Sequence, residues 1–136
     1  MFKHILMPID GTLTMVPTVR RCLHMASEMG AQVEAVHVLA SAPAGGDRDA
    51  PGAALARAHQ ILQMVESEAA AMGVPCVARI ADGVQPWQAI VAAASAGGAD
   101  LICMSSHGRL AAAGAALGSQ TAQVLTHATV PVLVLR

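Results

Sequence analysis

The most informative pattern in the chain lies in residues 100–136, DLICMSSHGRLAAAGAALGSQTAQVLTHATVPVLVLR. Residues 101–104 form a short apolar run of the kind that a buried parallel strand requires. A loop of small and polar residues follows, then a short helix over residues 120–127, and an apolar strand over residues 130–135. The segment therefore predicts a strand, a loop, a helix and a second strand, with the loop opening at the carboxyl end of the first strand.

The loop between these two strands has the features of a phosphate-binding site. Gly108 and Gly118 carry no side chain, so backbone N–H groups near them can approach an anion closely. Ser119 follows in the manner of a helix cap, and the amino end of the predicted helix adds partial positive charge. Arg109 stands beside the first glycine, where its guanidinium either meets phosphate oxygens or lies in a solvated loop. Residues 108–119 are therefore predicted to cradle a phosphate.

The rest of the chain alternates between strands and helices. Thr14 is the predicted N-cap of the first helix, and Asp82 and Gly83 are predicted to turn the chain after the third strand. That strand reads as a sheet edge because it contains a proline and Arg79. The predicted strands are residues 3–9, 32–39 and 75–80, and the predicted helices are residues 14–29, 53–72 and 86–96.

Strict alternation with short connections predicts a single α/β domain over residues 1–136. Its centre is a doubly wound, five-stranded parallel sheet, Rossmann-like, in a three-layer α/β/α arrangement. Hydrophobic residues make up 54% of the chain and charged residues only 12%, which suits strands that are covered on both faces. Ligand sites in such sheets lie at the carboxyl ends of the strands, where the turn at Asp10 and the loop after residues 101–104 are expected to face each other.

Two motifs at opposite ends of the chain resemble those of the universal stress protein family. Residues 8–12, PIDGT, look like the family's Pro-x-Asp-Gly-[ST] turn after the first strand. Nucleotide-binding members carry G-x2-G-x9-G-[ST] near the other end, and Gly108, Gly118 and Ser119 match its last three positions. Ser105 occupies the first glycine position, where its side chain either crowds a phosphate or donates a hydrogen bond to it. The resemblance covers essentially the whole chain.

The resemblance implies the strand order 3-2-1-4-5 and an adenine nucleotide, ATP or AMP, as the ligand. It places the base near the main chain of Ile9 and Val38, and the ribose near Asp10. Magnesium is implied only as part of a Mg-nucleotide, with Asp10 as its carboxylate ligand. The implied nucleotide-binding residues are Pro8, Ile9, Asp10, Val38, Met104, Ser105, Gly108, Arg109, Gly118, Ser119 and Gln120.

Composition argues against several other partners. A net charge of −1 with scattered Lys and Arg gives no basic stripe, so we expect neither nucleic-acid nor membrane binding. No apolar run approaches the length of a membrane span, and the amino terminus turns polar at Asp10 before a signal peptide could form. The three cysteines are an odd number in apolar surroundings, which favours buried thiols over disulfides or a metal site and indicates a reducing cytoplasm.

The leading hypothesis is an adenine-nucleotide-binding stress-response protein that acts as a sensor or regulatory module. The phosphate loop contains no lysine, so we expect at most a very slow ATPase. One alternative is a stress protein that binds no nucleotide and works through protein contacts, which Ser105 favours. A less favoured alternative is an adenylating enzyme of related fold, which ordinarily carries Ser-Gly-Gly-x-Asp or His-x-Gly-His after its first strand.

The last predicted strand bears on assembly. Residues 130–135 carry no charge, and an exposed apolar edge of this kind invites pairing with another chain. The family resemblance implies a homodimer in which two copies meet along this strand, through Val130, Val132 and Val134.

Overall fold

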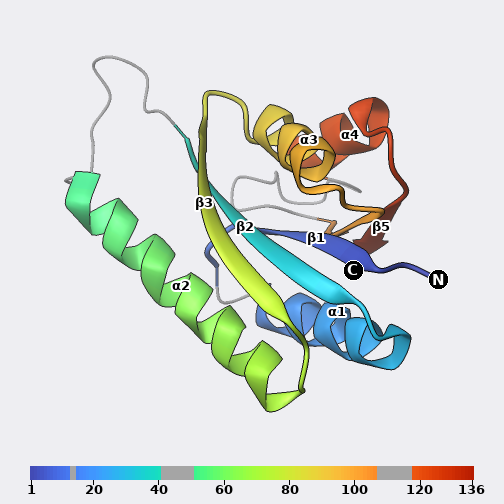
Figure 1. Ribbon diagram of the computed structural model, residues 1–136. Helices are drawn as coiled ribbons and strands as arrows, with labels where there is room; N and C mark the ends of the chain where they lie inside the picture. The colour runs from blue at the N-terminus through green and yellow to red at the C-terminus, as the bar shows by residue number, and fades with distance from the viewer. Residues whose placement is uncertain (13–14, 41–50, 107–117) are drawn as a thin grey trace.

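The structure is a computed structural model that describes residues 1–12, 15–40, 51–106 and 118–136. Within these residues, five strands alternate with four helices (Figure 1). In chain order the elements are β1 (His4–Ile9), α1 (Val16–Met29), β2 (Gln32–Ala40), α2 (Pro51–Ala71), β3 (Cys76–Gly83), α3 (Pro86–Gly97), β4 (Leu101–Ser105), α4 (Ser119–His127) and β5 (Val132–Leu135).

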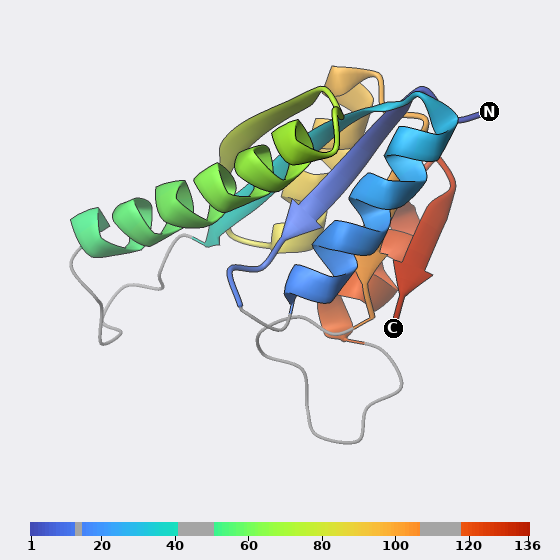
Figure 2. The same cartoon turned by 90° about the horizontal axis from the view of Figure 1, so that it is seen from below.

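The strands form one parallel sheet in the order β3-β2-β1-β4-β5. The predicted fold class, a Rossmann-like α/β sheet with the order 3-2-1-4-5, is therefore confirmed. Figures 1 and 2 show α1 and α2 on one face of the sheet, and α3 and α4 on the other. The third strand lies at an edge, as its sequence predicted, and β5 forms the opposite edge.

Side chains of β1 fill both cores, because successive residues of a strand point to opposite faces. Ile5 and Met7 pack under α1 and α2, in the same cluster as Leu23. Leu6 packs under α3 and α4, in the same cluster as Val124. This burial on both faces explains why the central strands read as continuous apolar runs.

Several predicted boundaries were wrong. The predicted turn at Asp82 and Gly83 is absent, because β3 stays in parallel register with β2 as far as the pair formed by Gly83 and Ala40. The last strand begins at Val132, not at Val130. The first helix begins at Val16, with Met15 as its N-cap residue, whereas the predicted cap Thr14 lies outside the described residues.

The amino ends of β1 and β4 are joined through one carboxylate. Asp100 accepts hydrogen bonds from the backbone N–H groups of Lys3 at 2.9 Å and His4 at 3.0 Å. The N–H of Asp100 in turn donates to the carbonyl oxygen of His4 at 2.9 Å. The bonds that the carboxylate accepts lower the pKa of the Asp100 carboxyl, and the bond from Lys3 has the largest effect.

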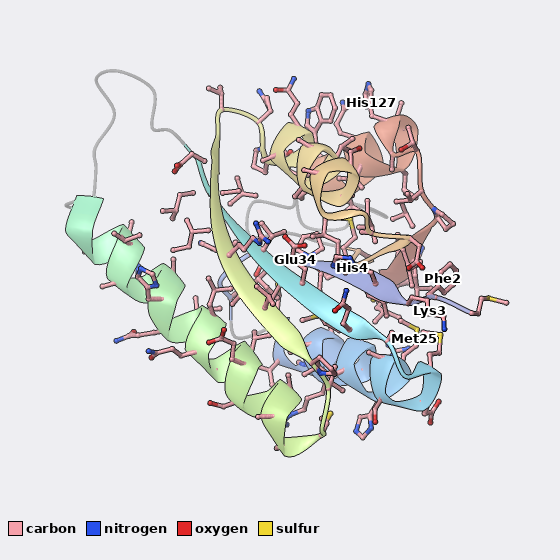
Figure 3. The ribbon with its side chains drawn as sticks, viewed as in Figure 1. Phe2, Lys3, His4, Met25, Glu34 and His127 are labelled. Atoms are coloured by element: carbon pink, nitrogen blue, oxygen red, sulfur yellow. The ribbon has the colours of Figure 1, made fainter. Side chains whose placement is uncertain are left out.

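Glu34 on β2 places a carboxylate inside the protein, where its side chain is only 7% exposed. Its Oε1 atom lies 3.1 Å from Nε of Arg79, and its Oε2 atom lies 3.4 Å from Nε2 of His4. Figure 3 shows the His4 and Glu34 side chains next to each other on the sheet. A buried carboxylate is tolerated when it is paired in this way, because an unpaired one would lose its hydration without compensation.

Candidate functional site

The candidate site lies at the carboxyl edge of the sheet. β1 ends at Ile9 and β4 ends at Ser105, and these two strands are neighbours that run in the same direction. The chain leaves β1 toward α1 and β2 on one side, whereas β4 and β5 lie on the other side. A sheet whose strand order reverses between two neighbours opens a crevice at their carboxyl ends, and ligands bind there in folds of this kind.

A tight turn built around Asp10 follows β1. The Oδ1 atom of Asp10 accepts hydrogen bonds from the backbone N–H of Thr12 at 2.9 Å and from its hydroxyl at 2.8 Å. Gly11, between them, has a φ of +85°, a conformation that a residue with a side chain rarely adopts. The backbone N–H of Asp10 lies 2.9 Å from the sulfur of Met15. The carboxylate is thus held in one orientation at the end of the strand.

His37 supports this turn from β2. Its Nδ1 atom lies 2.8 Å from the carbonyl oxygen of Ile9, and because a carbonyl only accepts, Nδ1 carries the hydrogen. A side chain added at Gly11 would place its Cβ only 3.1 Å from Cε1 of His37 and 3.2 Å from Cδ1 of Ile61. The ring therefore packs closely against the turn. Sequence reasoning missed this role, and the one available signal was a polar residue near the end of an apolar strand.

The amino end of α4 is fastened to the end of β4. The backbone N–H of Gly118 donates to the carbonyl oxygen of Ser106 at 2.6 Å. The hydroxyl of Thr121, which is 2% exposed, donates to the carbonyl oxygen of Ser105 at 3.0 Å. Ser106 is tied to the last strand, since its N–H donates to the carbonyl oxygen of Leu135 at 2.9 Å. No pattern in the sequence indicates these contacts of Thr121 and Ser106.

Gly118 takes the N-cap position of α4, and Ser119 is the first residue of the helix. The prediction that Ser119 caps the helix was therefore wrong by one position. A glycine cap supplies no side-chain oxygen, so it leaves the first N–H groups of the helix to other acceptors. The amino end of α4 accordingly keeps the partial positive charge that attracts anions.

Gln120 connects α4 to α3. Its Oε1 atom accepts a hydrogen bond from the backbone N–H of Trp87 at 3.0 Å. The ring of Trp87 also stacks on His127, with ring centroids 4.2 Å apart and an angle of 24° between the planes. The sequence had suggested Gln120 as a ligand of the nucleotide, and the structure gives its side-chain oxygen a partner within the protein.

Comparison with known proteins fits this geometry. All of residues 1–136 match the model of the universal stress protein family. The chain belongs to the universal stress protein family. It is 30% identical over 142 aligned residues to universal stress protein MJ0531 of Methanocaldococcus jannaschii, covering 100% of this chain and 83% of that protein.

Solved structures share the fold of this universal stress protein. One is the hypothetical protein MJ0577, with a TM-score of 0.84 and 24% identity over 99% of this chain and 96% of that one. Another is a universal stress protein in complex with cAMP, with a TM-score of 0.77 and 24% identity over 99% of this chain and 97% of that one. A third, from Archaeoglobus fulgidus, is in complex with dAMP, with a TM-score of 0.76 and 21% identity over 98% of each chain.

Most of the residues that sequence analysis suggested for the nucleotide lie at or next to this edge. Three belong to buried strand ends, namely Pro8, Ile9 and Met104. Val38 lies near the end of β2 and packs with the core under α3. Asp10, Ser105, Gly118, Ser119 and Gln120 follow or end the strands, or begin α4. Gly108 and Arg109 lie outside the described residues, and binding by any of these residues stays a prediction.

In the described part of the chain, none of the helices combines the length and the apolar character needed to span a bilayer.

Proposed function

We propose that this universal stress protein binds an adenine nucleotide at the carboxyl edge of β1 and β4 and acts as a sensor or regulatory module. The observation that carries the proposal is that the two predicted motifs, far apart in sequence, end neighbouring parallel strands. One supplies a carboxylate held at Asp10, and the other supplies the amino end of α4. A carboxylate suits a ribose hydroxyl, and a helix amino end suits a phosphate.

The nucleotide would lie across the edge with its base near β1 and β2. The base would meet the main chain of Ile9 and Val38, and the phosphates would lie against Gly118 and Ser119 and, in the loop before them, Gly108 and Arg109. The carbonyl oxygen of Ile9, the last residue of β1, accepts a bond from Nδ1 of His37 at 2.8 Å, which holds this main-chain group in place at the edge. That two proteins of this fold are known with cAMP and dAMP supports an adenylate as the ligand.

A sensor fits the chain better than a rapid enzyme. Phosphoryl-transfer enzymes place a lysine and metal-binding carboxylates around the phosphates. Residues 105–119 contain no lysine and no carboxylate. If the nucleotide brings Mg²⁺, Asp10 is the carboxylate that would hold it, because magnesium prefers oxygen ligands.

Two measurements test this function. Equilibrium dialysis of the purified protein against ATP and against AMP should show saturable binding of one nucleotide per chain. Mass spectrometry of any small molecule released by denaturing the purified protein should identify which adenine nucleotide accompanies it. Dialysis that shows no retention of either nucleotide at millimolar concentration would reject the proposal.

A second candidate is a stress protein that binds no nucleotide and works through protein contacts. Ser105 favours it, because this residue stands where nucleotide-binding relatives of this type carry a glycine. Ser105→Gly separates the two cases. The backbone of Ser105 pairs with β5 and accepts a bond from Thr121, and this substitution keeps both contacts. Binding that appears only in Ser105→Gly would show that the serine side chain blocks the site in the natural protein.

A further inference from the structure

The first turn of α3 takes its cap from a different helix. The first N–H groups of any α-helix lack acceptors within the helix, and the side chain of the N-cap residue usually supplies one. In α3 the N-cap residue is Gln85 and the helix begins at Pro86, so Trp87 carries one of these N–H groups. Its acceptor is Oε1 of Gln120 in α4, at 3.0 Å. Because the N–H is a donor, this contact also fixes which end of the Gln120 amide faces α3.

The same two helices meet again at the other end of α4. The Trp87 ring stacks on His127, the last residue of α4, at a centroid distance of 4.2 Å. Figure 1 shows α3 and α4 packed side by side on one face of the sheet, and Figure 3 shows His127 on the outer side of this pair. Trp87 therefore contacts both the first turn and the last turn of α4.

The first turn of α4 is also where the proposed phosphate site lies. Gly118 and Thr121 fasten this turn to the end of β4 through bonds to the carbonyl oxygens of Ser106 and Ser105. Gln120 lies between these two anchors, so its backbone belongs to the turn that a phosphate would contact, while its side chain caps α3. Gln120 therefore connects the turn of α4 that a phosphate would contact to the first turn of α3.

We infer that Gln120 is a positioning residue that links occupancy of the phosphate end of the site to the first turn of α3. The inference rests on the proposed nucleotide binding. A phosphate that orders the first turn of α4 also orders the Gln120 side chain, and through its oxygen the Trp87 N–H. By linkage, whatever holds Trp87 in place favours the nucleotide-bound arrangement of α4 by the same factor.

The test uses the full-length protein, with nucleotide binding and the state of Trp87 measured separately. Isothermal calorimetry with ATP and with AMP measures binding, and fluorescence reports only on Trp87 because the chain has a single tryptophan. Gln120→Met keeps the length of the side chain and removes the acceptor. Gln123→Met is the matched control, since Gln123 lies on the exposed side of the same helix. Its backbone oxygen accepts a bond from His127, and this bond does not involve the Gln123 side chain.

In the wild type and in Gln123→Met, we expect Trp87 fluorescence to change along the same curve as the heat of binding. In Gln120→Met, we expect affinity to fall about two- to tenfold, as the loss of one hydrogen bond implies. The Trp87 signal should change by less than half as much at saturation. In the free protein, the Trp87 backbone amide should exchange its hydrogen faster in Gln120→Met than in the control, as NMR can measure.

The outcomes separate the two proposals. A wild type that gives no heat with either nucleotide would reject the proposed function, and the coupling with it. If calorimetry shows nucleotide binding but Trp87 fluorescence does not change, the coupling is rejected and the proposed nucleotide binding is kept. The coupling is also rejected if Gln120→Met keeps the full Trp87 response, or if its Trp87 amide exchanges no faster than in the control.

Discussion

A side chain at Gly97 would collide with the buried carboxylate of Glu34. A Cβ at Gly97, the last residue of α3, would lie 2.7 Å from Oε2 of Glu34, far inside contact distance. The carboxylate cannot simply turn away, because Arg79 and His4 hold its two oxygens. The close approach of α3 to β2 therefore depends on a residue without a side chain at this position.

Gly97→Ala is expected to destabilise the protein. Alanine would favour the helix by about 1 kcal/mol, but displacing a buried, paired carboxylate costs more, so we expect a net loss of about 1–2 kcal/mol. Urea unfolding at neutral pH measures this loss in the free energy of unfolding. Gly52→Ala is the control, because nothing lies within 4 Å of a Cβ added there and α2 should accept alanine without loss. A Gly97→Ala protein as stable as the wild type would contradict the collision.

The Asp100 carboxylate gives stability a defined dependence on pH. Its pKa is lowered in the folded protein, chiefly by the Lys3 N–H, below the ordinary value of about 3.9. Because the pKa is lowered, the stabilisation of the folded protein by the ionised carboxylate is fully present above the unfolded-state pKa. It is lost as the pH falls through the folded-state pKa. The stability difference between the wild type and Asp100→Asn should therefore be constant from pH 7 to about 5 and shrink below about 4.

Urea unfolding of both proteins at several pH values checks this dependence. Asp82→Asn, which removes one negative charge elsewhere on the surface, serves as the control for the change in net charge. If the difference in the free energy of unfolding between the wild type and Asp100→Asn stays constant down to pH 3, the charge of Asp100 does not stabilise the protein through its bonds to Lys3 and His4.

Gly118→Val is expected to weaken ATP binding at least about tenfold, or roughly 1.4 kcal/mol. The valine side chain would stand at the cap of α4, where the proposed phosphates contact the helix. The same dialysis used for the wild type measures the loss, and circular dichroism confirms that the variant is folded. Unchanged affinity in a folded Gly118→Val protein would remove the amino end of α4 from the site.

ATP turnover should be absent or slow, on the order of one per minute or less, far below the roughly 1–100 s⁻¹ of kinases. The reason is the lack of a lysine in residues 105–119 and the use of Asp10 Oδ1 to hold Thr12. Phosphate release from highly purified protein is the measurement. Turnover of several per second that disappears in Asp10→Ala would overturn the sensor proposal.

The sequence predicted the elements better than it predicted the contacts between them. Apolar runs located every strand, and Gly30, Gly73 and Gly98, each with a positive φ, end helices at or beside the predicted places. These signals are local, because they depend on the periodicity or conformation of a short segment. The bonds that shape the site, such as Thr121 to Ser105 and Gln120 to Trp87, join different elements, so no local pattern contains them.

The error at Asp82 and Gly83 has a non-local cause. These two residues have the composition of a turn, yet their pairing with β2 keeps them in β3, which is a tertiary effect. The general rule for doubly wound sheets indicated that the ends of β1 and β4 belong to one site, and the family resemblance indicated an adenine nucleotide as its ligand.

The last prediction concerns the free edge of β5. This strand has β4 as its one neighbour in the described sheet, and its side chains are only partly covered. We propose that two copies pair antiparallel along β5. A twofold axis then lets the unpaired backbone N–H and C=O groups of this edge bond to the same edge of the other copy. Centred on Leu133, such pairing sets Val132 of one copy opposite Val134 of the other, with Val130 beyond the strand end.

Lysine at both Val132 and Val134 would then place like charges opposite each other, so we expect this double variant to be monomeric or insoluble. Threonine at both positions is the matched control, because it keeps the branched shape and adds no charge. Sedimentation at micromolar concentration measures the state of assembly. A monomeric wild type, or a lysine variant that still dimerises, would refute an interface along β5.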